Sequence, residues 1–476
     1  MNFQKLLSKP EGKTLEFKQD LSSLKPILKT LVAFANTAGG TMIIGRSDSG
    51  KITGVSDVLY EEERLASVIA DSIRPSLMPE LEVCSYGGKP LLIVTVPHWR
   101  GPFYLKAEGP EKGVYVRLGS TNRMAGDELL AELQRSLGGS TYDQMPLPDG
   151  TMRDLDMGKI EQAFASVGRV VDERKLETMG VLAPYMGKLT VSKGGIILFG
   201  CDKVRERFFP DARVSCARFR GTDRTDFIDR LDIEGSVFDA IDEVPRFIRR
   251  NTRMAARIGG MRRQDIPEYP EVAIREVLVN AIAHADYSLT GMHILIAIYS
   301  DRMEIQNPGM LPFGMTMDDF RSGVSKVRNR VIVRVFRELG LMEEWGSGYR
   351  RVLAACQDIG YPNPDWQELG SAFRVTFYPL SESKVPVNVP VNVPVNVPVN
   401  VPVNVPVNVP VNVPVNKRQQ WFLNQLVAGK RVKSTDLAHH WNVTEKTAKR
   451  DIADLKNQGM IEFVGSPKMG KYRLKE

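Results

Sequence analysis

One segment of the chain is a strict repeat that limits how the protein can fold. Residues 385–416 are the tetrapeptide Val-Pro-Val-Asn written eight times without error. A proline at every fourth position excludes a helix, because proline lacks the amide hydrogen and clashes with the preceding turn. We expect a semi-rigid, extended linker, although the valines on one side of an extended chain could also pair with a neighbouring chain. The repeat divides the protein into a long amino-terminal and a short carboxy-terminal part.

The positive charge of the protein belongs to the shorter part. The 476 residues include 64 Lys and Arg and 57 Asp and Glu, a net charge of +7. Residues 417–476 hold 13 of the basic and 6 of the acidic residues, which leaves 51 of each in the rest of the chain. A short basic segment is typical of a nucleic-acid-binding domain, because Lys and Arg near phosphates release bound counterions.

Several classes of protein are excluded because the sequence lacks their signatures. The four cysteines lie far apart without a Cys-x-x-Cys pair, which argues against a zinc ribbon or a disulfide framework. The first residues contain no apolar stretch of signal-peptide length, and no run approaches the roughly 18 apolar residues of a membrane span. We therefore expect a soluble, cytoplasmic protein without a membrane partner.

The carboxy-terminal part has the pattern of three helices and two strands. Residues 417–430 have the apolar spacing of a helix, a short helix follows Ser434, and a longer helix follows Thr444. In the longer helix, Ala448, Ile452 and Leu455 are expected to form a buried apolar stripe. Residues 460–465 and 472–475 are predicted strands around a turn rich in Gly, Pro and Lys.

This order of elements resembles a winged helix-turn-helix domain of bacterial transcription regulators. The resemblance implies that the second helix of the motif enters the major groove of DNA while the wing contacts phosphates. The alternative is a basic, solvent-exposed face on a winged domain that binds protein. The residues expected to contact DNA are Lys446, Lys449, Arg450, Lys468 and Lys471.

A second set of motifs indicates a nucleotide site. Glu276 and Asn280 are four residues apart in a predicted helix and therefore share one of its faces. The segment Asn307-Pro308-Gly309 follows a strand, and a Gly-Ser-Gly turn at 346–348 precedes a helix, where backbone amides can bind phosphate. The Gly-x-x-x-x-Gly-Lys-Ser/Thr motif of a P-loop is absent from the sequence. Each motif alone is also common on exposed helix faces and in simple turns.

Together and in this order, these motifs resemble the Bergerat-type ATP site of GHKL proteins such as gyrase, histidine kinases and mismatch-repair ATPases. They are closest to the divergent branch that bears the name of ATP-dependent helicase C-terminal domains, although no helicase motor is visible. The resemblance implies ATP and Mg²⁺ as cofactors, with Asn280 as the metal ligand and Glu276 activating water. Asn307 stands where the family has an adenine-binding Asp, which weakens the expected hydrogen bond. The other residues expected to bind nucleotide are Gly309, Gly346 and Gly348.

The amino-terminal segment carries a third set of motifs. The runs EGKTLEFKQD, AFANTAGGTMIIGRSDSGKITGV and YVRLGSTN resemble a Schlafen/AlbA-type domain across about residues 1–138. The family name implies nucleic-acid binding. In nuclease members of the wider family three carboxylates bind a divalent metal, and the matching positions are Glu11, Glu16 and Asp48, with Lys18 as a cation for the transition state. We favour the alternative that Glu16 and Lys18 form a structural ion pair and that Asp48 occupies a turn.

We therefore expect an α+β multidomain protein that binds ATP and DNA. The expected function is transcription regulation, with ATP controlling homo-oligomer assembly or DNA affinity and with at most weak ATP hydrolysis. The alternatives are a Schlafen-like, metal-dependent nuclease regulated by ATP, possibly in defence, and an assembly protein that associates through the repeat. The expected domains are a Schlafen/AlbA-type domain at 1–138, an intermediate α/β domain at 139–263, a GHKL-like α/β sandwich at 264–380, the repeat at 385–416 and the winged helix at 417–476.

Overall fold

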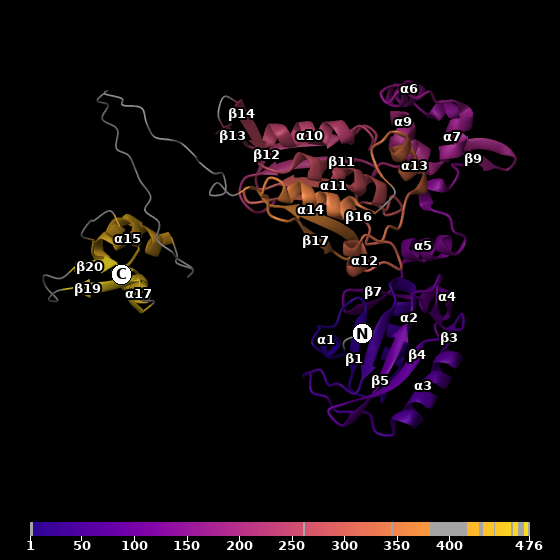
Figure 1. Cartoon of the computed structure of the whole chain (residues 1–476), viewed down its shortest axis with the longest axis horizontal. Coiled ribbons are helices and arrows are strands. Elements are labelled where there is room, and N and C mark those ends of the chain that lie inside the picture. Colours follow the sequence, from indigo (N-terminus) through magenta and orange to yellow (C-terminus); the bar gives the residue numbers. More distant parts are fainter. Residues whose placement is uncertain are drawn as a thin grey trace. The chain divides into compact units, whose positions relative to one another are not determined.

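The chain forms two compact units in this computed structural model, unit 1 (Met1–Asn388) and unit 2 (Val389–Glu476), and each is considered by itself (Figure 1). The residues that the structure describes are 3–259, 262–343, 346–380, 417–427, 432–441, 443–457, 460–464 and 471–474. They confirm a mixed α/β, multidomain architecture. The Val-Pro-Val-Asn repeat at 385–416 lies outside the described residues, so its extended conformation stays a prediction.

The amino-terminal region of unit 1 is built on a four-stranded sheet. Its strands are β1 (Leu15–Lys18), β2 (Gly40–Ile44), β4 (Glu80–Tyr86) and β5 (Lys89–Val96). Their order is β1-β2-β5-β4, with β1 and β2 parallel and the other pairs antiparallel. Two helices, α2 (Leu24–Thr37) and α3 (Val58–Ser72), contribute apolar side chains to the same core as this sheet.

Shorter elements complete this region and lead out of it. The two sides of the Asp-Ser-Gly turn after β2 are joined by a single bridge between Arg46 and Ile52. The shorter elements are α1 (Phe3–Leu7), β3 (Ile73–Arg74), β6 (Tyr104–Leu105), α4 (Gly109–Lys112), β7 (Tyr115–Leu118), β8 (Thr121–Met124), α5 (Asp127–Leu137) and the 3₁₀ turns Tyr142–Gln144 and Met152–Asp154.

The next segment is mainly helical, and it contains one element that differs from expectation. Residues 194–200, whose apolar composition predicts a strand, belong to helix α8 (Lys193–Phe199), so this prediction is wrong. The Ser192 side chain accepts a hydrogen bond from the amide of Gly195 and caps the helix. Every residue of 194–199 is buried, so no polar face reveals the helical period. The neighbouring elements are α6 (Met157–Ala165), α7 (Glu173–Met179), β9 (Leu182–Tyr185), β10 (Lys188–Val191) and α9 (Asp202–Phe208).

A six-stranded sheet forms the largest layer of unit 1. Its strands are β11 (Val214–Phe219), β12 (Phe227–Ile233), β15 (Ile294–Ile298), β16 (Met303–Pro308), β17 (Asp365–Glu368) and β18 (Ala372–Phe377). Their order is β12-β11-β15-β16-β18-β17, and β11 pairs with β15 in parallel, whereas the other described pairs of this sheet are antiparallel. The helices packed with this sheet are α10 (Ala240–Asn251), α11 (Glu271–His284) and α14 (Gly348–Gln357) (Figure 1).

One hydrophobic core joins this sheet to the helical segment before it. The core extends from Leu147 to Phe377 and includes side chains from α6, α8, β11, α11 and β18. The domain boundary expected near residue 264 therefore falls inside a shared core and between strands of one sheet, and the domain bounds stay predictions. The remaining elements are β13 (Met254–Gly259), β14 (Arg262–Pro267), α12 (Met317–Ser322) and α13 (Arg330–Glu338).

The described residues of unit 2 form three helices and a two-stranded sheet. Its elements are α15 (Lys417–Val427), α16 (Ser434–Trp441), α17 (Glu445–Asn457), β19 (Ile461–Val464) and β20 (Lys471–Leu474). The two strands pair antiparallel. Ala448, Ile452 and Leu455 are buried in a core with Phe422 and Leu437, which confirms the apolar stripe predicted on the longer helix. In the whole described part of the chain, no helix is both long and apolar enough to cross a membrane.

Arg328 joins distant segments of unit 1 through a buried ion-pair cluster. Its Nη1 lies 2.7 Å from Glu132 Oε1 in α5 and 3.0 Å from Asp286 Oδ2 after α11, and its Nη2 donates to Met310 O at 2.8 Å. The Arg328 side chain is only 9% exposed. Burial raises the pKa of Glu132, and the positive charge of Arg328 opposes that rise. The guanidinium is therefore needed to stabilise two buried carboxylates.

We expect Arg328→Gln to destabilise unit 1 strongly, because Glu132 and Asp286 would remain buried without their cation. Losing one partner of a buried ion pair costs about 3–5 kcal/mol. Urea unfolding followed by circular dichroism measures the change in the free energy of unfolding. The control is Arg246→Gln, which removes an exposed pair with Glu243 and should cost less than about 1 kcal/mol. Equal effects of the two substitutions would contradict a structural role for the cluster.

Candidate functional site

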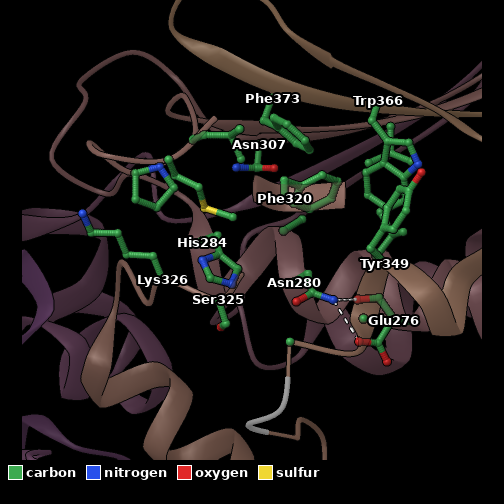
Figure 2. Close-up of a pocket in the computed structure, with 18 of the residues that line it drawn as sticks. Glu276, Asn280, His284, Asn307, Phe320, Ser325, Lys326, Tyr349, Trp366 and Phe373 are labelled. Atoms are coloured by element: carbon green, nitrogen blue, oxygen red, sulfur yellow. Dashed lines mark hydrogen bonds between the residues drawn. The ribbon is translucent and has the colours of Figure 1, made fainter. Parts of the chain in front are cut away.

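A pocket lies between helices α11 and α14 and the end of strand β16. Figure 2 shows that its walls come from segments far apart in the sequence. Helix α11 contributes polar side chains, β16 contributes Asn307, and the turn before α14 contributes glycines. The lining residues include Glu276, Asn280, His284, Asn307, Met310, Phe320, Lys326, Gly346, Gly348, Tyr349, Arg351, Trp366 and Phe373. The structure thus brings the three predicted nucleotide-site motifs to one cavity.

Glu276 and Asn280 interact directly on one turn of α11. Asn280 Nδ2 donates to Glu276 Oε1 at 3.0 Å and to the backbone oxygen of Glu276 at 2.7 Å (Figure 2). On the other side of the carboxylate, Arg351 Nη2 lies 3.6 Å from Glu276 Oε2. The shared helix face predicted from the four-residue spacing is confirmed. The carboxylate is positioned between an amide and a guanidinium, and the Asn280 side-chain oxygen accepts no bond among those found in the described residues.

Glycine at positions 346 and 348 allows α14 to begin directly beside this pair. A Cβ at Gly348 would lie 2.9 Å from Glu276 Oε1 and 3.2 Å from Asn280 Nδ2. Gly346 has φ +62°, and a Cβ there would lie 2.2 Å from the backbone oxygen of Gly323. The first amides of a helix are unpaired and carry partial positive charge, so they attract anions. The turn therefore places a helix N-terminus where an anionic group could contact both α11 residues.

Asn307 lines the pocket at the end opposite to Glu276 and is the second-last residue of strand β16. Its side chain is 7% exposed, and its Nδ2 donates to Pro308 O at 3.1 Å. Gly309 follows with φ +95°, and a Cβ there would approach Asp286 Cβ at 2.8 Å. Glycine is therefore required for this loop to leave the strand beside α11.

An aromatic wall lines the pocket, and the sequence motifs did not reveal it. The ring centroid of Phe320 lies 5.3 Å from that of Tyr349, 5.1 Å from Trp366 and 5.6 Å from Phe373 (Figure 2). Trp366 Nε1 is buried and has no hydrogen-bond partner in the described part of the chain. The wall can pack against a flat ring.

His284 and Lys326 are two further titratable residues that line the pocket. Burial, assisted by the charge of Arg328, lowers the pKa of His284 to about 4. Burial and the charge of Arg100 lower the pKa of Lys326. His284 is therefore neutral near pH 7, when an uncharged imidazole can act as a hydrogen-bond donor or acceptor.

The amino-terminal candidates do not form a metal site. Glu16 is buried and forms ion pairs with Arg117 and Lys18, while Glu11 Oε1 accepts a hydrogen bond from the Phe17 amide. Asp48 lies in the turn after β2. Throughout the described residues, no group of three or more His, Cys, Asp or Glu side chains could hold a metal ion. The three carboxylates of the nuclease alternative are thus not assembled in this structure.

The candidate DNA-contacting residues lie on α17 and near β20 of unit 2. Lys446, Lys449 and Arg450 are exposed on α17, and Lys449 Nζ lies 2.9 Å from Glu445 Oε1. Lys468 lies outside the described residues, and for Lys471 only the backbone of β20 is described. Three of the five candidates therefore share one exposed helix face.

Two family models match segments of unit 1. Residues 11–126 match the family described as "Schlafen, AlbA_2", and residues 291–377 match the family described as "Putative ATP-dependent DNA helicase recG C-terminal". The second match includes Asn307 and the Gly-Ser-Gly turn but begins after Glu276 and Asn280. The chain therefore has a Schlafen-like amino-terminal domain and an ATPase-like domain, which associate it with nucleotide- and DNA-related function.

Two solved structures illustrate what the chain is similar to. The DIP2311 protein from Corynebacterium diphtheriae matches 99% of this chain and 98% of its own, at 17% identity and a TM-score of 0.41. The amino-terminal domain of a "Putative ATP-dependent DNA Helicase RecG-related Protein" from Nitrosomonas europaea matches 26% of this chain and 90% of its own, at 31% identity and a TM-score of 0.21. No curated protein gives a significant match.

The low pKa of His284 predicts a loss of stability in acid. In the unfolded chain the imidazole of His284 binds a proton near pH 6.5, whereas in the folded protein its lowered pKa of about 4 delays protonation to that pH. The unfolded state therefore holds more protons in this window, and the free energy of unfolding falls as the pH falls through it. His284→Gln should reduce this decrease by up to about 3 kcal/mol, measured by urea unfolding at several pH values. An unchanged pH dependence would contradict burial of a neutral imidazole.

Proposed function

We propose that the pocket of unit 1 binds ATP with Mg²⁺ and that this nucleotide controls a DNA-binding function. The main observation behind the proposal is that the N-terminus of α14 lies directly beside Glu276 and Asn280. Phosphates at this helix end would be bound by backbone amides and by the positive end of the helix dipole. The ATPase-like family match supports this assignment.

Asn280 is the proposed metal ligand, and Glu276 the proposed base for water. The Asn280 side-chain oxygen is the kind of hard donor that Mg²⁺ prefers, and phosphate oxygens and water would complete an octahedral shell. Bound Mg²⁺ would neutralise charge on the phosphates. Arg351 Nη2 lies 3.6 Å from Glu276 Oε2 and Asn280 Nδ2 donates to Glu276 Oε1, so both carboxylate oxygens are engaged, which suits positioning of water more than proton uptake. ATP is therefore proposed as a regulatory ligand with at most slow hydrolysis.

The base is proposed to lie between Asn307 and the aromatic wall. Asn307 Nδ2 is engaged by Pro308 O, which leaves its side-chain oxygen to accept a hydrogen bond from the amino group of adenine. An Asn can therefore replace the Asp of related sites, with a weaker, uncharged acceptor. Gly309 allows this strand end to approach the ligand closely.

Asn280→Ala should weaken Mg²⁺-ATP binding by about tenfold or more, because it removes the metal ligand and frees Glu276 from its amide partner. Isothermal titration calorimetry of the full chain, with and without Mg²⁺, measures the affinity. The matched control is Gln162→Ala, an exposed amide on α6, which should leave the affinity unchanged. Wild-type affinity in Asn280→Ala would remove the basis of the proposed site.

Unit 2 is the proposed DNA reader, with the fold of a winged helix-turn-helix. Its three helices and antiparallel strand pair occur in the order that this fold requires, and the exposed face of α17 presents Lys446, Lys449 and Arg450. Basic residues on such a helix contact phosphates and base edges in the major groove. We propose that the protein is a transcription regulator and that ATP binding alters its assembly as a homo-oligomer or its affinity for DNA.

Replacing Lys446, Lys449 and Arg450 with Gln should weaken duplex DNA binding and reduce its salt dependence. Each lost phosphate contact lowers the slope of log affinity against log salt by about 0.9. Fluorescence anisotropy at several salt concentrations measures both quantities. The charge-matched control replaces exposed Lys188, Lys203 and Arg246 of unit 1 with Gln. An equal change in the two triple variants would show that net charge, and not α17, determines binding.

A further inference from the structure

The six-stranded sheet has a second face with a different chemistry. Val214, Cys216 and Ile296 point to the core that contains α10, α11 and α14. Their strand neighbours point the other way, and Phe219, Ala297 and Tyr299 form a separate small cluster there. We call this side the outer face. The nucleotide pocket lies on the helix-covered side, so the outer face is a different surface.

Aromatic rings form a row across three neighbouring strands of the outer face. The Phe219 centroid lies 4.8 Å from that of Phe227 and 5.3 Å from that of Tyr299, whose ring is stacked at 15°. The Arg302 guanidinium lies over the Tyr299 ring, 4.0 Å from its centroid. Phe227 ends the row and is 57% exposed. A phenylalanine exposed beside other rings offers a stacking surface for a further flat ring.

The ion pairs around this row of rings contain more arginine side chains than carboxylates. The buried Glu304 carboxylate lies 2.8 Å from Arg302, 3.3 Å from Arg224 and 3.5 Å from Arg374. Asp232 lies 2.7 Å from Arg230 and 3.6 Å from Arg213, and Asp301 pairs with Arg302 at 3.0 Å. Five guanidinium groups thus share three carboxylates.

The two most exposed of these arginines stand three residues before and three residues after Phe227 in the sequence. The side chain of Arg224 is 48% exposed and that of Arg230 is 62% exposed. Both keep donors available for another anion, because a guanidinium has five N–H groups.

A hollow of about 250 Å³ lies within this arrangement. The small side chains of Ala217 and Ala297 are in its wall, and Phe227, Arg224 and Arg230 also line it. The wall is mostly apolar, whereas the bordering groups are cationic and aromatic. A ligand that matches both needs a flat apolar ring joined to an anionic group, which is the chemistry of a nucleotide unit.

We propose that the outer face binds single-stranded nucleic acid, with one base in the hollow. Phe227 would stack on that base, and Arg224 and Arg230 would contact the flanking phosphates. A duplex does not fit this role, because its bases are paired and stacked away from such a pocket. A free mononucleotide would contact fewer arginines than the outer face offers. Arg302, which directly precedes β16, and Arg374 of β18 extend the set of arginines beyond the hollow. The proposal does not depend on ATP binding at Glu276 and Asn280.

The test compares two variants of the full chain, each with six substitutions, by fluorescence anisotropy with a short single-stranded DNA of mixed sequence. Both carry Gln at Lys446, Lys449 and Arg450, which weakens any contribution of α17. The first adds Arg224→Gln, Phe227→Ala and Arg230→Gln on the outer face. The matched control adds Arg246→Gln, Arg249→Gln and Val272→Ala, which are exposed positions on α10 and α11.

We expect the outer-face variant to bind single-stranded DNA about tenfold or more weakly than the control variant. Phe227→Ala alone should weaken binding without changing the salt slope, whereas the two Arg substitutions should lower the slope by about 0.7 for each lost contact. Circular dichroism and urea unfolding show that the variants are folded. The proposal is overturned if single-stranded DNA fails to bind the unsubstituted chain, or if it binds the outer-face variant and the control variant equally.

The same experiment tests a free nucleotide as the occupant. In an Asn280→Ala background, AMP is added at the same total nucleotide concentration as the oligonucleotide. The proposal expects AMP to leave the oligonucleotide bound, because only the strand contacts several arginines. Displacement by AMP would assign the hollow to a mononucleotide and would overturn single-stranded nucleic acid as its ligand.

Discussion

The close approach of two helices at Gly348 is the constraint on which the candidate site depends. A Cβ at Gly348 would lie 2.9 Å from Glu276 Oε1 and 3.2 Å from Asn280 Nδ2, so a larger residue there would displace these two side chains from the first turn of α14. This contact places unpaired backbone amides, a carboxylate and an amide side chain around one point. The positive end of a helix, the proposed metal ligand and the proposed base for water are thereby combined without a P-loop.

The shared core explains how this site could influence the rest of unit 1. Helices α11 and α14 belong to the same core as α8 and β11, so a shift at the pocket moves elements that are packed at high density. Arg328 adds a polar connection, because it contacts Glu132 of α5 and the loop at Met310 that lines the pocket. A ligand that reorders this loop would therefore act on the amino-terminal region through an ion-pair cluster.

The sequence predicted the local features of the site but not those formed by distant segments. The shared face of Glu276 and Asn280 and the core stripe of α17 follow from helical spacing alone. The aromatic wall did not, because Phe320, Tyr349 and Trp366 are in three separate elements and have no common motif. Helix α8 was missed because burial on all sides removes the period that distinguishes a helix from a strand.

We propose above all that ATP at the unit 1 pocket controls DNA binding by the whole chain. The most direct test is the affinity of the full chain for duplex DNA, measured by anisotropy with and without saturating Mg²⁺-ATP. A coupling free energy of about 1–3 kcal/mol predicts a change of about 5- to 150-fold. The account further predicts that this change disappears in the Gly348→Val variant, whose side chain would occupy the space beside Glu276 and Asn280. Equal DNA affinity with and without bound ATP would contradict the claim.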